Sequence, residues 1–167
     1  MDLQAKKTAL RMIPYGLFVL TARSDDGQIA AGSVNWVTQS SFDPPQVVVC
    51  VRNDSSLHTV IDRARSFALN AVGKGQASMA VRFFKPAEVA GDRLGGFPFI
   101  PGASGAPLLT DAPAYLECAV VGSLSAGDHT VFIGEVKEAY AELDSDDRPD
   151  EMILMLNDLE GEIFYGG

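Results

Sequence analysis

The sequence predicts a mainly β domain in which antiparallel strands close into a barrel and a few short helices are inserted. Three observations indicate this fold. Apolar runs of strand length recur along the chain, most of them are joined by hairpin-like turns, and helical spacing of apolar residues is confined to short stretches. A length of 167 residues is that of one ordinary domain, so we expect residues 1–167 to form a single domain.

The first half of the chain begins with a short helix, which Pro14 ends because proline cannot continue a helix. Asp25-Asp26-Gly27 is a tight turn signal between two strand-like segments. The run 46–51 is apolar on both faces and is therefore expected to be a central strand. These patterns predict a helix at 3–12 and strands at 17–21, 29–37 and 46–51.

The second half starts at a helix N-cap signal, Asn53-Asp54-Ser55-Ser56. Residues 85–107 are rich in glycine and proline and are expected to form a long structureless loop with a functional role. The acidic segment 142–151 is expected to be a solvated loop. We further expect helices at 56–65 and 76–84, strands at 67–71, 115–124 and 130–140, and a terminal hairpin from 152–156 and 162–165.

A dinucleotide-binding βαβ fold is the alternative to a barrel, because Gly73-Lys74-Gly75 follows a strand and precedes a helix. The third glycine of that fingerprint is absent, since Ser78 stands in its place. No later strand ends in an acidic residue at the expected distance. We therefore interpret these glycines as a connecting turn.

Composition excludes several classes of function. A net charge of −9 argues against nucleic acid or an anionic membrane as the main partner. The sequence shows neither a secretory signal nor an apolar run long enough to span a membrane, so a cytoplasmic protein is expected. Cys50 and Cys118 lie in apolar runs and are interpreted as buried hydrophobic residues. Only two histidines accompany them, so no metal site is predicted.

The strongest functional signal is a run of uncharged polar side chains between two strand-like segments. Thr38, Gln39, Ser40 and Ser41 stand before Asp43-Pro44-Pro45. A hydrogen-bonded turn is the simplest interpretation of such a run. Hydroxyls, an amide and turn N–H groups also suit a ligand with a polar planar ring and a phosphate, as in a flavin nucleotide.

A second hydroxyl-rich segment favours the ligand interpretation. Arg52, Ser55 and Ser56 lie where the strand after Pro45 ends and a helix begins. A helix N-terminus offers unpaired N–H groups and the positive end of the helix dipole, and an arginine adds a cation, which together suit a phosphate.

Two further residues are candidates for the same site. Trp36, the single tryptophan, follows Asn35 at a strand end, where contact with a flat ligand competes with ordinary burial in the core. His129 follows a hairpin turn and Asp128, at a strand end where a pocket would open. A structural histidine is the alternative there.

Taken together, these segments resemble the flavin reductase family, whose fold is an FMN-binding split barrel. The segment Trp36-Val37-Thr38-Gln39 is most similar to the flavin reductase-like modules of cyanobacterial diflavin flavoproteins. The matching pieces are spread over most of the chain and keep the family's order: residues 13–21, 35–45, 67–70, 105–109, 114–118 and 127–136.

The resemblance implies an antiparallel Greek-key split barrel and a homodimer that binds FMN, with FAD as an alternative flavin. It implies that Ser33, Val34, Asn35 and Trp36 hold the ring, that Thr38 to Ser41 with Arg52, Ser55 and Ser56 hold the phosphate, and that His129 lies on the nicotinamide side.

We therefore expect a flavin reductase that transfers hydride from NADH or NADPH to bound FMN, with a possible downstream oxygenase or other electron acceptor. The alternatives are an FMN-carrying electron-transfer protein, reduced by another protein, and a flavin- or haem-binding module without turnover.

Overall fold

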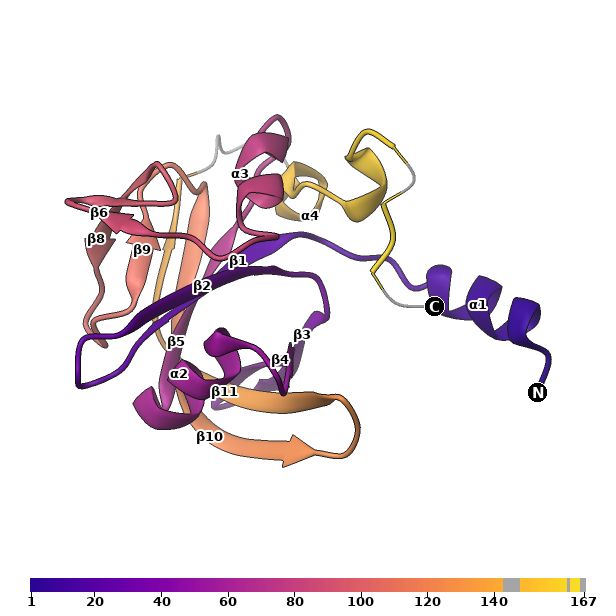
Figure 1. Ribbon diagram of the computed structural model, residues 1–167, viewed down its shortest axis with the longest axis horizontal. Coiled ribbons are helices and arrows are strands. Elements are labelled where there is room, and N and C mark those ends of the chain that lie inside the picture. The colour runs from indigo at the N-terminus through magenta and orange to yellow at the C-terminus, as the bar shows by residue number, and fades with distance from the viewer. Residues whose placement is uncertain (143–147, 162, 166–167) are drawn as a thin grey trace.

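The computed structural model describes residues 1–142, 148–161 and 163–165. It is mainly β with antiparallel strands, as predicted (Figure 1). The helices are α1 (Leu3–Arg11), α2 (Ser56–Ala64), α3 (Ala77–Arg82) and α4 (Pro149–Met152). The strands are β1 (Phe18–Arg23), β2 (Ile29–Val34), β3 (Val37–Phe42), β4 (Pro45–Arg52), β5 (Ser66–Ala71), β6 (Val89–Ala90), β7 (Arg93–Leu94), β8 (Phe97–Pro101), β9 (Pro107–Leu109), β10 (Ala114–Ser125) and β11 (His129–Ala141).

Seven strands form one sheet in the order β2-β1-β5-β10-β11-β4-β3. β2 and β3 lie at opposite ends of this order, yet only Asn35 and Trp36 separate them in the chain. Two residues cannot cross a flat sheet of this width, so the sheet must curl until its ends meet. We call Asn35–Trp36 the seam. The result is the predicted split barrel. The Cys50 N–H donates to the Trp36 carbonyl at 3.1 Å, which continues the pairing of β3 with β4 into the seam.

Apolar side chains from the strands and from α2 fill the barrel. Phe67 on β5 and Phe132 on β11 are fully buried, and Val60 and Ile61 of α2 belong to the same cluster. The helix begins at its N-cap Ser55, whose Oγ accepts a hydrogen bond from the backbone of the first turn. The core therefore fixes the position of the N-terminus of α2, which matters for the site.

Residues 85–107 are not a structureless loop, so this prediction was wrong. They form most of a second sheet, β6-β7-β8-β9, drawn at the left of Figure 1. Its first two strands have two residues each, which is too short for any periodic pattern to reveal. Gly91 lies between β6 and β7 and Gly95 between β7 and β8, and their positive φ values of 63° and 60° allow the tight turns there.

Two buried polar groups attach the second sheet to the barrel. Asn70 on β5 accepts through Oδ1 from the Leu109 N–H on β9, at 2.9 Å. Glu117 on β10 accepts from the N–H groups of Ala103 and Ser104, at 3.2 and 3.1 Å. Both side chains are buried, so these bonds form where water does not compete.

The polar run 38–41 is a strand rather than a turn. It forms β3, which lies at the end of the sheet order and has β4 as its one strand partner among the described residues. Thr38, Gln39 and Ser40 are exposed. An antiparallel sheet can carry polar side chains on a face that meets water, which explains why a strand could have this composition.

The C-terminal hairpin is also absent among the described residues. Ile153 and Met155 instead form single bridges with Gly73 and Gly16. Glu162, expected in that hairpin, lies outside the described residues, as do residues 143–147 of the acidic segment. The end of that segment forms part of α4.

Candidate functional site

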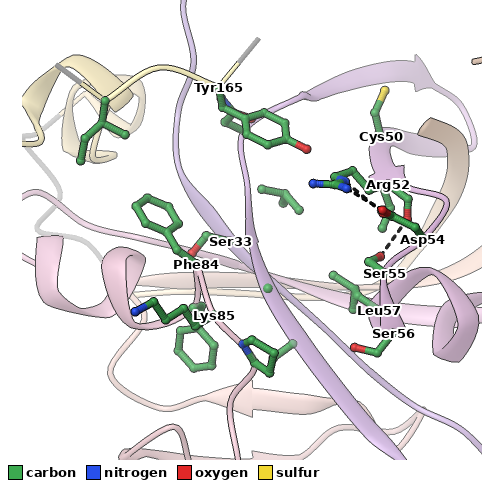
Figure 2. Close-up of a pocket in the computed structure, with 18 of the residues that line it drawn as sticks. Ser33, Cys50, Arg52, Asp54, Ser55, Ser56, Leu57, Phe84, Lys85 and Tyr165 are labelled. Carbon is green, nitrogen blue, oxygen red and sulfur yellow. Dashed lines mark hydrogen bonds and ion pairs between the residues drawn. The ribbon is translucent and has the colours of Figure 1, made fainter. Parts of the chain in front are cut away.

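A cavity of about 600 Å³ opens beside the seam. Five parts of the chain form its walls: the end of β2 with Asn35, the end of β4, the start of α2, the segment after α3, and residues 163–165. Figure 2 shows Arg52, Asp54 and Ser55 on one side, with Phe84 and Lys85 facing them across the cavity. Its volume is in the range typical of sites for small molecules and cofactors.

The segment after α3 is held against β2 by two hydrogen bonds. Ser33 Oγ donates to the Ala80 carbonyl at 2.7 Å, and the Ser33 N–H donates to the Phe83 carbonyl at 3.0 Å. These bonds fix the end of α3 and so place the next residues, Phe84 and Lys85, as a wall of the cavity.

The seam contributes two buried donors without acceptors. Asn35 is 6% exposed, and neither its Nδ2 nor Nε1 of Trp36 has a hydrogen-bond partner among the described residues. A buried donor without an acceptor costs about 1–3 kcal/mol. Since Asn35 lines the cavity, its amide fits a ligand that brings an acceptor, such as a flavin ring with its carbonyl oxygens and ring nitrogens.

The start of α2 supplies a region suited to an anion. Ser55 caps the helix, and Ser56 and Leu57 of its first turn line the cavity. The first N–H groups of a helix have no partners within the helix and carry the positive end of its dipole. With Lys85 on the facing wall, this end of the cavity fits a phosphate group.

Arg52 is already paired within the cavity wall. Its Nε and Nη2 donate to the two carboxylate oxygens of Asp54, at 3.0 and 2.5 Å. The hydrogen bond from Arg52 lowers the pKa of Asp54, and the hydrogen bond to Asp54 raises the pKa of Arg52. A phosphate that binds Arg52 therefore has to share its guanidinium group with Asp54.

His129 lies at the start of β11, opposite Arg52 on β4. Its Nδ1 is 2.8 Å from Asp128 Oδ1, and its Nε2 is 2.8 Å from the Tyr165 hydroxyl. A proton on Nδ1 satisfies the carboxylate and leaves Nε2 to accept from Tyr165. Trp36 completes the group, with ring centroids 4.6 Å from His129 and 5.4 Å from Tyr165.

The charges around this group shift the pKa values of Asp128 and Tyr165. The hydrogen bond from His129 lowers the pKa of Asp128 and keeps the carboxylate ionised. Burial raises the pKa of Tyr165, Arg52 opposes this, and Asp128 and Asp54 add to the rise. Tyr165 therefore keeps its proton and can donate it in a hydrogen bond at neutral pH.

The structure brings together about half of the predicted binding residues. Those that line the cavity are Ser33, Val34, Asn35, Arg52, Ser55 and Ser56. Trp36 and His129 lie beside it, behind Tyr165. The four residues of the polar run, Thr38, Gln39, Ser40 and Ser41, lie on β3 outside the lining of the cavity, so a single copy of the chain does not place them beside Arg52.

Sequence reasoning missed Phe84, Lys85 and Tyr165, which complete the cavity. Lys85 follows the expected helix at 76–84 and begins the glycine-rich segment, and a cation at such a junction is a usable signal. Tyr165 offers a weaker signal, an aromatic pair with Phe164 in a polar region.

The described residues were compared with what a metal site and a membrane-spanning helix require. They contain no cluster of three or more histidine, cysteine or acidic side chains that could hold a metal ion. Within the same residues, every helix is too short or too polar to cross a membrane.

Comparison with known proteins identifies the family. The model of the flavin reductase-like domain matches residues 10–160. The chain is 32% identical over 129 residues to diflavin flavoprotein A 1 of Synechocystis sp., covering 77% of this chain and 22% of that protein. The chain thus spans about a fifth of that relative.

Two solved structures share the fold over more than four fifths of each chain. The styrene monooxygenase flavin reductase of Pseudomonas putida S12 has a TM-score of 0.71 and 25% identity, covering 92% of this chain and 91% of that chain. An NADH:FAD oxidoreductase of Streptomyces globisporus in complex with NAD and FAD fragments has a TM-score of 0.71 and 31% identity, covering 83% of this chain and 81% of that chain.

These likenesses support a general role in flavin oxidoreduction. They also confirm the resemblance drawn from the sequence. Because the family model covers most of its length, the chain belongs to the flavin reductase-like domain family.

Proposed function

We propose that this protein is an NAD(P)H-dependent flavin oxidoreductase that transfers hydride from a reduced nicotinamide to bound FMN. The observation that carries the proposal is the buried Asn35 amide, which lines the cavity and whose Nδ2 lacks an acceptor in the described residues. Membership of the flavin reductase-like family supports flavin chemistry, and the unpaired Asn35 donor supports the cavity at the seam as the flavin site.

The residues of the seam bind the ring in this proposal. Asn35 donates to an acceptor on the ring edge, and the backbone from Ser33 to Trp36 forms the surface against which the ring lies. Ser55, Ser56 and the free N–H groups of α2 bind the phosphate, together with Arg52. Phe84, on the opposite wall, shields the bound ligand from water.

When bound, the flavin supplies the redox chemistry by accepting a hydride from the reduced nicotinamide. The protein has to hold the two rings in contact and stabilise the negative charge that develops on the ring. Neutral donors such as the Asn35 amide do this without a protein base. His129, oriented by Asp128, would position the nicotinamide.

FMN is the expected flavin, with FAD as the alternative named in one neighbour.

We also propose a homodimer. A second copy would be needed to use the polar side chains of Thr38 to Ser41, which one copy leaves exposed or half-buried on its end strand. A downstream oxygenase is one possible acceptor of the electrons, since a neighbour is the reductase of a styrene monooxygenase.

An FMN-carrying electron-transfer protein is the second candidate. It is favoured by the similarity to a diflavin flavoprotein, of which this chain corresponds to only 22%. In that case a protein partner rather than a nicotinamide nucleotide would reduce the bound flavin. The two candidates therefore differ in whether NADH or NADPH alone reduces the protein.

The test is a flavin titration followed by reduction. We expect saturable binding of FMN, with oxidation of NADH or NADPH that depends on added FMN. His129→Ala should leave flavin affinity within about twofold and slow reduction about 10- to 100-fold, the scale of effect of misplacing a bound substrate. Flavin binding without reduction by either nucleotide would favour the electron-transfer protein, and no flavin binding would remove both candidates.

Arg52→Ala tests the phosphate end of the site. Loss of a charge-assisted hydrogen bond should weaken FMN binding about tenfold. The matched control is Arg63→Ala, which removes an exposed arginine from the far end of α2. Equal effects of the two substitutions would contradict the proposed role of Arg52.

A further inference from the structure

Tyr165 is the boundary between two cavities. It lines the cavity at the seam, and it also lines a second cavity of about 360 Å³ between α1 and the C-terminal residues. In Figure 2 its ring lies over the edge of the first cavity, with the hydroxyl directed toward the side of Arg52. Ile163 and Phe164 line both cavities as well, so residues 163–165 separate the two spaces, and Tyr165 is the one of them that contacts His129.

The same ring occupies the side of His129 that a ligand would need. Asp128 uses Nδ1 of His129, and the Tyr165 hydroxyl uses Nε2 at 2.8 Å. Both ring nitrogens are thus engaged, and the His129 side chain is only 12% exposed. Its ring also contacts Trp36. No polar atom of His129 is left for a ligand while Tyr165 stays in place.

We propose that Tyr165 is a positioning residue that controls access to His129, and that it must leave this place before a nicotinamide ring can be seated there. This inference rests on the proposed function, in which His129 lies on the nicotinamide side. It adds a step to that function, because the protein then exists in a closed form and in a form able to bind the nicotinamide.

The contacts of Tyr165 are compatible with such a movement. One hydrogen bond and two aromatic edge contacts hold the ring, which is 42% exposed. The second cavity gives the ring a space to enter when it turns away. Its neighbour Phe164 is held separately, since the Arg11 guanidinium lies 3.7 Å from the centre of the Phe164 ring. The chain can therefore stay attached at Phe164 while Tyr165 moves.

A closed form lowers the apparent affinity for the nicotinamide by the fraction of molecules that are open. Tyr165→Phe removes the hydroxyl and keeps the ring, so it should raise that fraction. Loss of one hydrogen bond corresponds to about a 3- to 10-fold change in such an equilibrium. We expect NAD⁺ or NADP⁺, whichever the flavin-loaded wild type binds, to bind Tyr165→Phe about 3- to 10-fold more tightly. The affinity for FMN should change less than twofold.

Tyr140→Phe is the matched control. Tyr140 is 43% exposed, and its hydroxyl donates one hydrogen bond to Glu142, away from the cavity. The Tyr140→Phe substitution should alter neither the affinity for FMN nor the affinity for the nicotinamide nucleotide. With NADH or NADPH as reductant, the KM of Tyr165→Phe should fall by the same factor as the dissociation constant, and kcat should be nearly unchanged. A residue that only supported the fold would not produce this split.

Trp36 provides a readout that needs no turnover. It is the single tryptophan and contacts both His129 and Tyr165, so its fluorescence in the flavin-free protein reports on this group. The emission should change in Tyr165→Phe and stay the same in Tyr140→Phe. Unchanged emission, or unchanged or weaker nicotinamide binding in Tyr165→Phe, would overturn the inference alone. A wild type that binds no flavin would overturn the proposed function and this inference with it.

Discussion

Two buried asparagines show how differently one residue type can be used. Asn70 has both ends of its amide satisfied: Nδ2 donates to the Val19 carbonyl at 3.0 Å and Oδ1 accepts from the Leu109 N–H at 2.9 Å. Asn35 is almost as deeply buried but leaves its Nδ2 without an acceptor in the described residues. The first amide therefore contributes to stability, and the second is available for a ligand.

This contrast gives a prediction at the scale of the residue. Asn35→Ala should change the free energy of unfolding of the flavin-free protein by less than about 1 kcal/mol and weaken FMN binding about tenfold. Asn70→Ala should instead destabilise the protein by about 2–3 kcal/mol, because it leaves several buried groups unpaired. Urea unfolding and flavin titration of both variants would check this, and a strongly destabilised Asn35→Ala would contradict the assignment.

At the scale of the element, the sequence predicts those strands that contain a run of apolar residues of strand length. β1, β4, β5, β10 and β11 meet this condition, and all were expected close to their observed bounds. β3 could not be recognised, because a strand at the end of a sheet can be polar where it meets water. β6 and β7 could not be recognised because two residues carry no period.

The site follows the same division. Arg52 to Ser56 could be predicted because they lie where an expected strand ends and a helix begins, whereas Ser33 to Asn35 were expected from the resemblance to flavin reductases. Tyr165 could not, since its contact with His129 spans 36 positions and depends on the path of the C-terminal residues. Local pattern contains no information about such a pairing.

The packing of β11 on its neighbours gives a prediction for an element. A Cβ added to Gly134 would lie 2.4 Å from Phe67 Cζ and 2.8 Å from the Cys118 Cβ, so the core has to shift to admit it. Gly134→Ala should lower the free energy of unfolding by about 1–3 kcal/mol. Gly127→Ala is the control, because nothing lies within 4 Å of the added atom. Denaturant unfolding of both variants measures the difference, and equal stabilities would contradict this account of the packing.

At the scale of the whole molecule, α1 is a helix that the described residues of one copy leave uncovered. It has no buried residue and projects away from the barrel in Figure 1. Leu3 and Leu10 are 72% and 41% exposed. An isolated helix of nine residues is marginal in water, so a second copy that covers this helix would stabilise it.

The corresponding prediction concerns the proposed homodimer. Replacing Leu3 and Leu10 together by serine should raise the dimer dissociation constant at least tenfold, while replacing Lys6 and Lys7 by serine should change it little. Light scattering after size-exclusion chromatography at several concentrations measures the mass. A monomeric wild type, or a dimer indifferent to both pairs of substitutions, would exclude this role for α1.

The two-residue junction between β2 and β3 also limits how the gene can change in length. One added residue would have to bulge out of the seam, because the hairpin with β4 fixes the register of β3 on the far side of the junction. The same insertion would displace the Asn35 amide from the cavity. Insertions and deletions at this point therefore damage folding and ligand recognition together.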